Sequence, residues 1–256
     1  MKNKFTLILI VLLTQFTLYS ISHSQDSKKW SYQFEVYALA ANIEGTATVG
    51  RASGAPIDVG FDKILENLEL AGMLHFEAFH ESAWGVIVDY AFMDLAGTKK
   101  NPRDGIAKVG VRQGMLEALA AYRIDRGDTR IDFFAGIRWW DNDLELTLDP
   151  AIHEGSASLR VKEDWVDVIV GGRIIAPLSQ KWFFIGHADI GGLELSSDLT
   201  ISASAGVRYQ MTKSAILDLR YKALWVDYEN DNTGSKGGFA YDTVTHGPLI
   251  GVIFEF

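Results

Sequence analysis

Two histidines each stand two residues before a carboxylate, in segments where polar and apolar residues alternate. His187 precedes Asp189, and His75 precedes Glu77. Residues i and i+2 of an extended strand share a face, so each pair would place an imidazole beside a carboxylate. A histidine oriented in this way can act as a general base. Alternating polar positions also produce such pairs by chance, and no serine in a nucleophile motif accompanies them. We therefore predict no catalytic residue.

A second group of carboxylates, Asp141, Asp143, Glu145 and Asp149, follows one of these segments. Such a group could serve a carboxylate protease or bind divalent cations. We favour a simpler interpretation, in which these side chains form a solvated acidic rim. We predict neither a metal site nor a cofactor.

In the segments that must position these residues, apolar and polar residues alternate with a period of two over about ten residues. This is the pattern of membrane β-barrel strands. In 215–227, for example, Leu217, Leu219 and Tyr221 share one face, and Asp218 and Arg220 share the other. Ten segments follow this pattern: 30–43, 68–80, 84–96, 107–123, 130–144, 164–177, 182–193, 199–211, 214–229 and 242–256. The sequence predicts an all-β, antiparallel up-and-down transmembrane barrel of about ten strands, with eight or twelve as alternatives.

The connections between these segments alternate in length, as in bacterial outer-membrane barrels. Tight turns are predicted at 80–83, 125–128, 178–181 and 211–213, and long loops at 44–67, 97–106, 145–163 and 230–241, with 194–198 the short exception. Aromatic residues gather near both ends, as membrane interfaces require. We expect one girdle at the short turns (Trp30, Tyr32, Trp84, Tyr122, Trp182, Tyr209, Phe254, Phe256) and one at the long loops (Tyr90, Phe92, Trp139, Trp140, Trp225, Tyr228).

Composition narrows the function classes. The chain has 256 residues, 48% hydrophobic and 22% charged, a formal charge of −9 and no cysteine. These values exclude wholesale disorder, disulfides and thiolate chemistry, and the acidic balance argues against a nucleic-acid partner. Residues 1–24 have the charged start, apolar stretch and small-residue cleavage site of a secretory signal. We expect the barrel domain to span 25–256.

The polar faces of the segments define an expected lumen. Its charged residues would be Glu35, Glu69, His75, Glu77, Asp89, Glu117, Arg123, Asp132, Arg138, Asp167, Arg173, His187, Asp189, Arg208, Asp218, Arg220, Lys222 and Glu255. In a narrow barrel, opposite charges on facing strands would pair and fill the interior, because an unpaired buried charge is costly. The alternative is a narrow pore whose acid-rich wall favours small or cationic solutes.

The long connection 44–67 contains Phe61, Ile64, Leu65 and Leu68 at helical spacing, which predicts a short amphipathic helix over 60–68. As a loop lid, this helix could close the barrel mouth, or it could lie on the outer leaflet. A loop cap packed on the strand ends, with no gating role, is the simpler alternative.

The chain ends in Gly251-Val252-Ile253-Phe254-Glu255-Phe256. This resembles the terminal assembly signal of outer-membrane barrels, in which Gly251, Phe254 and Phe256 would be the signal residues; Leu249 departs from the usual polar residue. More broadly, the chain resembles small, mostly uncharacterised proteobacterial outer-membrane barrels related loosely to the outer membrane protein A and opacity-protein barrels. The stretches that carry this resemblance are 58–67, 75–78, Trp84-Gly85, 189–192, 197–200, 217–221 and 247–251.

The resemblance implies a Gram-negative outer-membrane location, contact with lipid and lipopolysaccharide, and insertion by the barrel-assembly machinery. It supplies no catalytic residues. The sequence therefore favours a non-enzymatic protein, either structural or a narrow passive conduit. Two alternatives stay open: an enzyme with a His-carboxylate site in the lumen or rim, and an adhesin or receptor acting through loops 44–67 and 145–163. Oligomeric state is not predicted.

Overall fold

The computed structural model describes residues 29–50, 52–100, 106–149, 157–230, 232, 235 and 237–256. The predicted signal segment 1–24 lies outside these residues. The described elements are β1 (Trp30–Leu39), β2 (Asn42–Val49), β3 (Ala52–Val59), α2 (Phe61–Asn67), β4 (Leu68–His80), β5 (Trp84–Lys100), β6 (Ile106–Arg126), β7 (Thr129–Asp149), β8 (Ala157–Pro177), β9 (Trp182–Gly192), β10 (Leu199–Gln210), β11 (Ala215–Glu229) and β12 (Phe239–Glu255).

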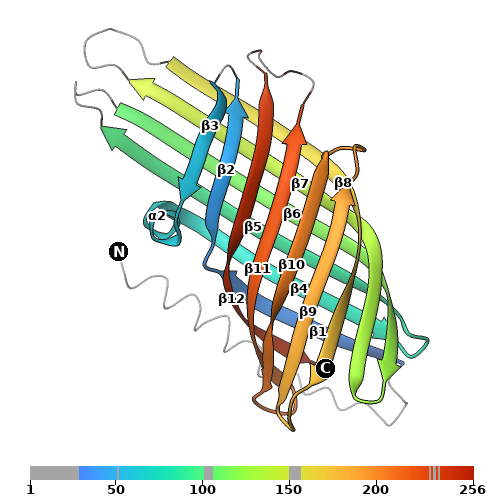
Figure 1. Cartoon of the computed structure of the whole chain (residues 1–256). Helices are drawn as coiled ribbons and strands as arrows, with labels where there is room; N and C mark the ends of the chain where they lie inside the picture. The colour runs from blue at the N-terminus through green and yellow to red at the C-terminus, as the bar shows by residue number, and fades with distance from the viewer. Residues whose placement is uncertain are drawn as a thin grey trace.

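Ten of these strands close into an antiparallel barrel, which confirms the predicted fold and strand number. β1 pairs with β4, each strand from β4 to β12 pairs with the next, and β12 returns to pair with β1 (Figure 1). The closing register sets Val36 opposite Val252 and Gln33 opposite Glu255. Closure satisfies the backbone groups that an open sheet would leave at its edges.

The prediction of a long loop over 44–67 is wrong for most of its length, because β2 and β3 form a hairpin there. β2 continues the line of β1 and pairs with the upper part of β12, from His246–Asn42 to Phe239–Val49. Small residues obscure the strand pattern in this part of the sequence. Backbone pairing to the free edge of β12 forms the strand although the sequence signal is weak. Gly45 has φ 140°, and a Cβ there would lie 2.2 Å from the Asp242 carbonyl oxygen, so only glycine fits this close approach.

Three strands are much longer than a bilayer requires. β6, β7 and β8 each have 21 residues, whereas about 9–11 residues cross a membrane. The predicted loops 97–106 and 145–163 are therefore shorter than expected, since β5 continues to Lys100, β7 to Asp149, and β8 begins at Ala157. We call the ends of β5–β8 beyond the barrel the projecting wall; it extends to one side of the barrel axis (Figure 1).

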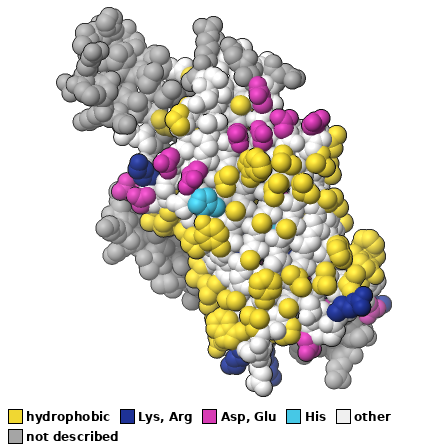
Figure 2. Space-filling model, in the orientation of Figure 1, with side chains coloured by type: hydrophobic (Ala, Val, Ile, Leu, Met, Phe, Trp, Pro, Cys, Tyr) yellow, Lys and Arg dark blue, Asp and Glu magenta, His cyan; other side chains and the backbone are white. Residues whose placement is uncertain are grey.

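The outward face carries a band of large apolar side chains (Figure 2). Its members are exposed although they are hydrophobic, and include Val36, Leu74, Val86, Val88, Phe133, Ile137, Val166, Val168, Val170, Ile190 and Ile250. The charged side chains instead lie inside or beyond the band. This arrangement, apolar outside and polar inside, is that of a membrane-spanning barrel. Within the described residues, no helix has the length and apolarity that crossing a bilayer demands.

Both girdles are present, with one correction. Trp84, Trp182 and Phe256 are exposed at the short-turn end, and Trp139 and Trp225 at the opposite border. Trp140 and Tyr228, which we predicted in the outer girdle, are buried at 3% and 8% exposure. Trp140 is adjacent to Trp139, so alternation forces the two indoles to opposite faces. Tyr228 shares the inward face of β11 with Leu224 and Val226.

Candidate functional site

The barrel interior holds most of the charged residues singled out from the sequence. The structure buries Glu35, Glu77, Asp89, Glu117, Asp132, Arg138, Asp167, Arg173, Asp189, Arg208 and Asp218, and leaves His187, Arg220 and Lys222 partly buried. Glu69, also predicted inside, is exposed because a register shift between Leu68 and Leu70 of β4 interrupts the alternation. Charged groups therefore occupy the middle of the barrel, and apolar clusters lie between them and on their long-loop side.

One charged cluster is centred on Arg173 of β8. Its Nε donates to Asp132 Oδ2 at 3.0 Å, and its Nη2 donates to Glu77 Oε2 at 2.8 Å. Arg123 donates from Nε to Asp132 Oδ1 at 2.7 Å, so that Asp132 is shared by two guanidinium groups. Glu77 belongs to β4 and Arg173 to β8, so this contact crosses the barrel rather than following one strand pair.

A second charged cluster is centred on Arg138 of β7, which is fully buried. Arg138 donates to Glu117 Oε1 at 2.7 Å, to Asp189 Oδ1 at 2.9 Å and to Thr200 Oγ1 at 3.0 Å. These partners come from β6, β9 and β10, so the guanidinium joins strands on several sides. A charge held by several hydrogen bonds in this way has its desolvation cost offset.

A third charged group joins β1, β10 and β11. Asp218 accepts from Arg208 at 3.1 Å and from Arg220 at 3.0 Å, and Arg220 also reaches Glu35 at 3.4 Å. The three clusters pair cations and carboxylates from both sides of the barrel, which fills its middle with fixed ion pairs.

The His–carboxylate pairs are parts of these networks. His75 contacts Asp89 Oδ2 through Nδ1 at 2.9 Å and Glu77 Oε1 through Nε2 at 2.8 Å, so both ring nitrogens are occupied. His187 contacts Asp189 Oδ2 at 2.9 Å, a carboxylate that Arg138 also holds. A general base needs a free nitrogen within reach of its substrate. The geometry of His75 therefore gives it a bridging role between two carboxylates.

Asp167 is bound by uncharged donors alone, and we did not foresee this arrangement. The indoles of Trp140 and Trp165 both donate to its Oδ2 at 3.2 Å, and Ser197 donates from its backbone nitrogen at 3.0 Å and its hydroxyl at 2.9 Å. Four donors satisfy the carboxylate without a cation. Asp167 thus ties the charged middle of the barrel to the aromatic residues beyond it.

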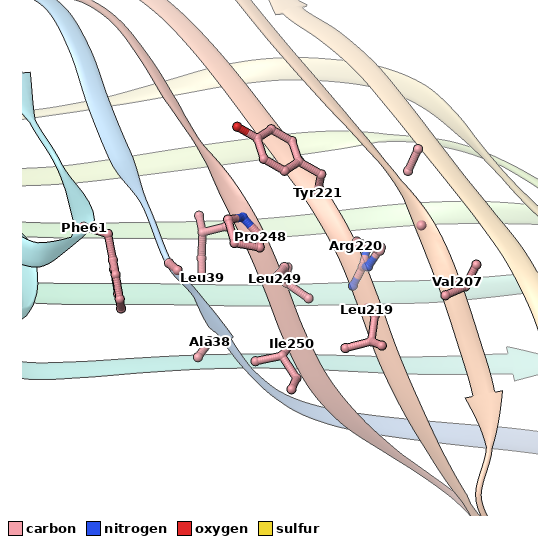
Figure 3. Close-up of a pocket in the computed structure, with 13 residues that line it drawn as sticks. Ala38, Leu39, Phe61, Val207, Leu219, Arg220, Tyr221, Pro248, Leu249 and Ile250 are labelled. Carbon is pink, nitrogen blue, oxygen red and sulfur yellow. The ribbon is translucent and has the colours of Figure 1, made fainter.

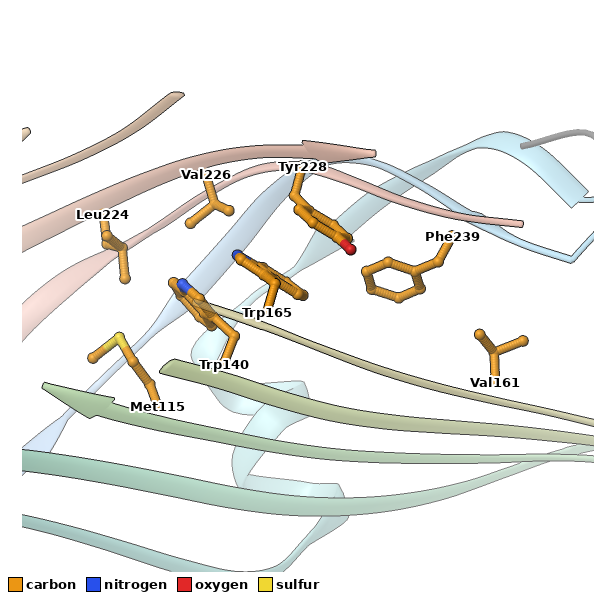
Figure 4. Packing of buried hydrophobic residues seen from close by; sticks show 8 residues of the cluster. All are labelled: Met115, Trp140, Val161, Trp165, Leu224, Val226, Tyr228 and Phe239. Atoms are coloured by element: carbon orange, nitrogen blue, oxygen red, sulfur yellow. The ribbon is translucent and has the colours of Figure 1, made fainter. Parts of the chain in front are cut away.

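Those aromatic residues form a cluster toward the long-loop end, which we call the aromatic plug. Its buried members are Met115, Trp140, Val161, Trp165, Leu224, Val226, Tyr228 and Phe239 (Figure 4). The rings of Trp165 and Tyr228 stack with centroids 3.9 Å apart, and the ring of Trp140 stacks on that of Trp165 with centroids 5.5 Å apart. A smaller apolar cluster, Phe79, Ile87, Leu119, Ala121, Phe134 and Ile169, begins on β4 and β5 and lies along β6, β7 and β8 between the Arg173 and Arg138 charged clusters.

Helix α2 packs on residues of β2, β3 and β5. Ile64 is buried against Ala41 and Ile43, while Phe61 and Leu65 stay 40% and 59% exposed and Leu68 is partly buried. The outward side of this region includes a groove of about 540 Å³ over β10, β11, β12 and β1, edged by Phe61 (Figure 3). Its apolar lining belongs to the lipid-facing band.

The proposed assembly residues lie in the closing strand. Gly251 is opposite Tyr37 in the β1–β12 register, and a Cβ there would lie 2.1 Å from Glu35 Oε1. Phe254 and Phe256 are exposed at 37% and 59% in the girdle at the short-turn end. Gly251 therefore makes room for a lumenal carboxylate, and the two phenylalanines face outward.

Beyond the membrane band, acidic residues gather at its border, as Figure 2 shows. On the projecting wall, Asp94, Arg112, Asp143 and Lys162 stand opposite one another in register across β5, β6, β7 and β8. We call these four residues the charge row. Alternating charges in neighbouring strands stabilise a sheet. The side chain of Asp149 lies outside the described part of the chain. Among described residues, no group of three or more His, Asp or Glu is arranged to hold a metal ion.

The cations beside Asp143 in the projecting wall change the pKa of its carboxyl group. The hydrogen bond from Arg160, with the charges of Arg160 and Lys162, lowers the pKa of Asp143 below its ordinary value. The ion pair thus stabilises the folded wall at neutral pH, and this contribution is lost as pH falls through the lowered pKa.

Arg160→Gln with Lys162→Gln should raise the pKa of Asp143, measured by carboxyl-carbon NMR. Lys181→Gln, in the turn before β9, is the control; an unchanged Asp143 titration in the double variant would contradict the ion pair.

Comparison with known proteins gives the fold its class. No protein-family model and no curated relative matches the chain. The outer membrane protease OmpT from Escherichia coli matches in structure with a TM-score of 0.52 and 8% identity, over 92% of this chain and 99% of that chain. The translocator domain of the autotransporter NalP from Neisseria meningitidis matches with a TM-score of 0.49 and 11% identity, over 98% and 97%.

A third solved structure, the attachment invasion locus protein Ail of Yersinia pestis, matches at a TM-score of 0.34 and 10% identity, over 89% of this chain and 99% of that chain. At these identities the likeness concerns the fold alone. The fold is that of an outer-membrane β-barrel.

Proposed function

We propose that this protein is an integral, non-enzymatic barrel of a Gram-negative outer membrane, with a lumen sealed against ions and a structural role. The observation that carries the proposal is the set of three ion-pair clusters across the middle of the barrel. Arg138 and Asp132 are both fully buried, and each is held by partners from more than one strand. A passing ion would have to break contacts that desolvated charges hold strongly.

The apolar clusters support the same proposal. The aromatic plug lies on the long-loop side of the Arg138 cluster, and the cluster around Phe134 lies between the Arg138 and Arg173 clusters. Ions cross apolar constrictions poorly, because the pore must be hydrated for them to pass. The narrow-conduit alternative would need an open path through both clusters and through the ion pairs.

Electrical recording tests the sealed lumen. The purified full chain, folded and inserted into a planar lipid bilayer, should show no stepwise conductance at any applied voltage. Insertion is checked in the same preparation by protease protection of the membrane strands in vesicles. Reproducible single-channel steps from the inserted wild-type protein would overturn the sealed lumen and favour a conduit.

The geometry of the histidines supports the non-enzymatic part of the proposal. Both nitrogens of His75 contact carboxylates, and the carboxylate beside His187 is shared with Arg138. Ser204 stands opposite His187 in the β9–β10 register. Among the described residues no hydrogen bond joins the two side chains, so a Ser–His–Asp relay is not assembled.

A second candidate function is surface binding through the projecting wall. The 21-residue strands β6–β8 and the charge row hold this wall beyond the membrane band. Rigid sheet beyond the membrane suits presentation of a binding surface better than bare anchoring. Cells that display the wild-type barrel should bind a host-cell or matrix surface more than cells that display Arg112→Glu with Lys162→Glu, which reverses the cations of the row. Equal binding by both would contradict this role.

We further propose that residues 1–24 direct export, that Gly251, Phe254 and Phe256 are read by the barrel-assembly machinery, and that the outward band contacts lipid and lipopolysaccharide. The outward exposure of Phe254 and Phe256 supports recognition of the last strand before closure. The apolar band supports the lipid contact.

A further inference from the structure

Lys222 is the one cation in the described barrel interior without a carboxylate within salt-bridge distance. Arg123, Arg138, Arg173, Arg208 and Arg220 each have one or more. Lys222 projects from the inward face of β11 and is partly buried. Asp89 lies within electrostatic range of Lys222, but its two oxygens already accept from Tyr37 and His75 at 2.7 and 2.9 Å.

Lys222 borders a cavity of about 80 Å³ between β11 and the opposite strands. Three of the lining side chains are methionines, Met73, Met93 and Met115, and Leu224 and Trp140 add further apolar surface. Methionine adapts its shape to what it contacts. The cavity therefore combines a flexible apolar wall with a single positive charge.

An ammonium group beside an apolar cavity is costly unless an anion accompanies it. We propose that this cavity binds a short-chain monocarboxylate, whose carboxylate pairs with Lys222 and whose alkyl chain packs among the three methionines. The volume exceeds what one water needs and is about half that of an apolar cavity that accepts benzene, which restricts the ligand to a short chain. This site goes beyond the sealed-lumen proposal and does not depend on it.

The entrance lies in the side of the barrel. β1 pairs with β4 only as far as Val36–Leu74, and the chain beyond pairs through β2 with β12 and β3. Above Val36, no strand pairing among the described residues joins β2 or β3 to β4 or β5. We call this interruption the seam. Only side-chain packing closes it, so it can open without loss of backbone hydrogen bonds between strands.

Helix α2 covers the seam. Its Ile64 packs on Ala41 and Ile43, with Leu39 and Met93 beside them. The same four residues, Leu39, Ala41, Ile43 and Met93, also line the cavity. The outer wall of the cavity is thus the apolar contact that Ile64 makes. Displacement of α2 would connect the cavity with the outer surface, where Phe61 and Leu65 are exposed. We infer that the ligand exchanges through the seam.

Butyrate binding tests the site. The folded full chain in detergent micelles should bind butyrate in a calorimetric titration, and bind the uncharged butyramide at least about tenfold more weakly, since the ion pair is absent. Lys222→Met, which removes the charge and keeps an unbranched side chain one atom shorter, should weaken butyrate binding by a similar factor. Lys162→Met removes an exposed lysine of the projecting wall and should bind as the wild type does.

A filled cavity gives a second readout. Ala91→Leu adds volume at a lining position without removing a charge, and it should also weaken butyrate binding. Each variant is first shown to be folded by its circular dichroism. Absence of butyrate binding to the wild type, or equal binding by folded Lys222→Met, would overturn the site. The bilayer recording tests the sealed lumen separately.

The route is tested with a disulfide, because the chain has no cysteine of its own. Ile43→Cys with Ile64→Cys places two thiols in the contact that closes the seam. Oxidation should slow the exchange of bound and free butyrate, measured by NMR line shape, and reduction should restore it. Equal exchange rates in the oxidised and reduced forms would overturn entry through the seam.

Discussion

An Arg173→Met barrel should lose about 3–5 kcal/mol of its free energy of unfolding, the usual cost of removing one partner from a buried ion pair. Arg173 is 6% exposed and donates to both Glu77 and Asp132. Methionine fills much of the same space, but it leaves two carboxylates facing each other without their shared cation. Arg123 still donates to Asp132 at 2.7 Å, whereas Glu77 keeps only His75 at 2.8 Å and a longer contact with Arg123 at 3.6 Å, so Glu77 carries most of the loss.

Urea unfolding in lipid vesicles, followed by tryptophan fluorescence, measures this change. Arg160→Met is the matched control, because it removes an exposed arginine from the projecting wall. The control should change the unfolding free energy by less than about 1 kcal/mol. If both variants unfolded alike, the ion pairs would not stabilise the barrel. Glu77→Gln in the Arg173→Met background should recover part of the loss, since it removes the stranded charge.

Trp165→Ala should cost about 3–5 kcal/mol, as other large-to-small changes of buried aromatic residues do. Trp165 is 4% exposed, stacks on Tyr228 and donates its indole hydrogen to Asp167. Alanine would leave a cavity in the aromatic plug and remove one of the four donors to that carboxylate. The same urea titration measures the effect.

Trp139→Ala is the control for this variant, because Trp139 faces outward at the membrane border with 38% exposure. Its loss should be smaller, since lipid can fill the space that the side chain leaves. A Trp165→Ala protein as stable as the wild type would show that the plug packs loosely. The phenylalanine variant Trp165→Phe separates the two causes, because it restores most of the ring volume but not the donor.

Alternation predicted the barrel because the period of two is a local property of each strand. Along β7, for example, the sequence assigns Phe133 outward and Phe134 inward, and they are 55% and 5% exposed. The strand number and the short helix followed from the same pattern and from helical spacing. These features need no knowledge of which strands face each other across the barrel.

The interior contacts could not be predicted because they depend on the shear of the barrel. Arg173 and Glu77 lie 96 residues apart, and Arg138 and Asp189 lie 51 apart. Which cation meets which carboxylate is set by the relative height of distant strands. The cavity at Lys222 was missed for the same reason, since its lining comes from several strands.

The β2–β3 hairpin was missed for a different reason. Most of its residues are small or polar, with glycine and proline among them, so the segment has the composition of a loop. The upper part of β12 offers a free edge, and backbone pairing to that edge forms the strand. The ends of β6–β8 likewise extend because their neighbours extend, which no single segment reveals.

The closing pair of strands has a consequence for how the molecule forms. Gln33 and Glu255 are joined across β1 and β12 although 222 residues separate them. Ring closure therefore waits for contacts between the first and last described strands. Such distant contacts have a high entropic cost and form slowly. Until then the sheet has two unpaired edges, each able to capture a strand from another molecule. The period before closure is when this protein most needs protection from aggregation.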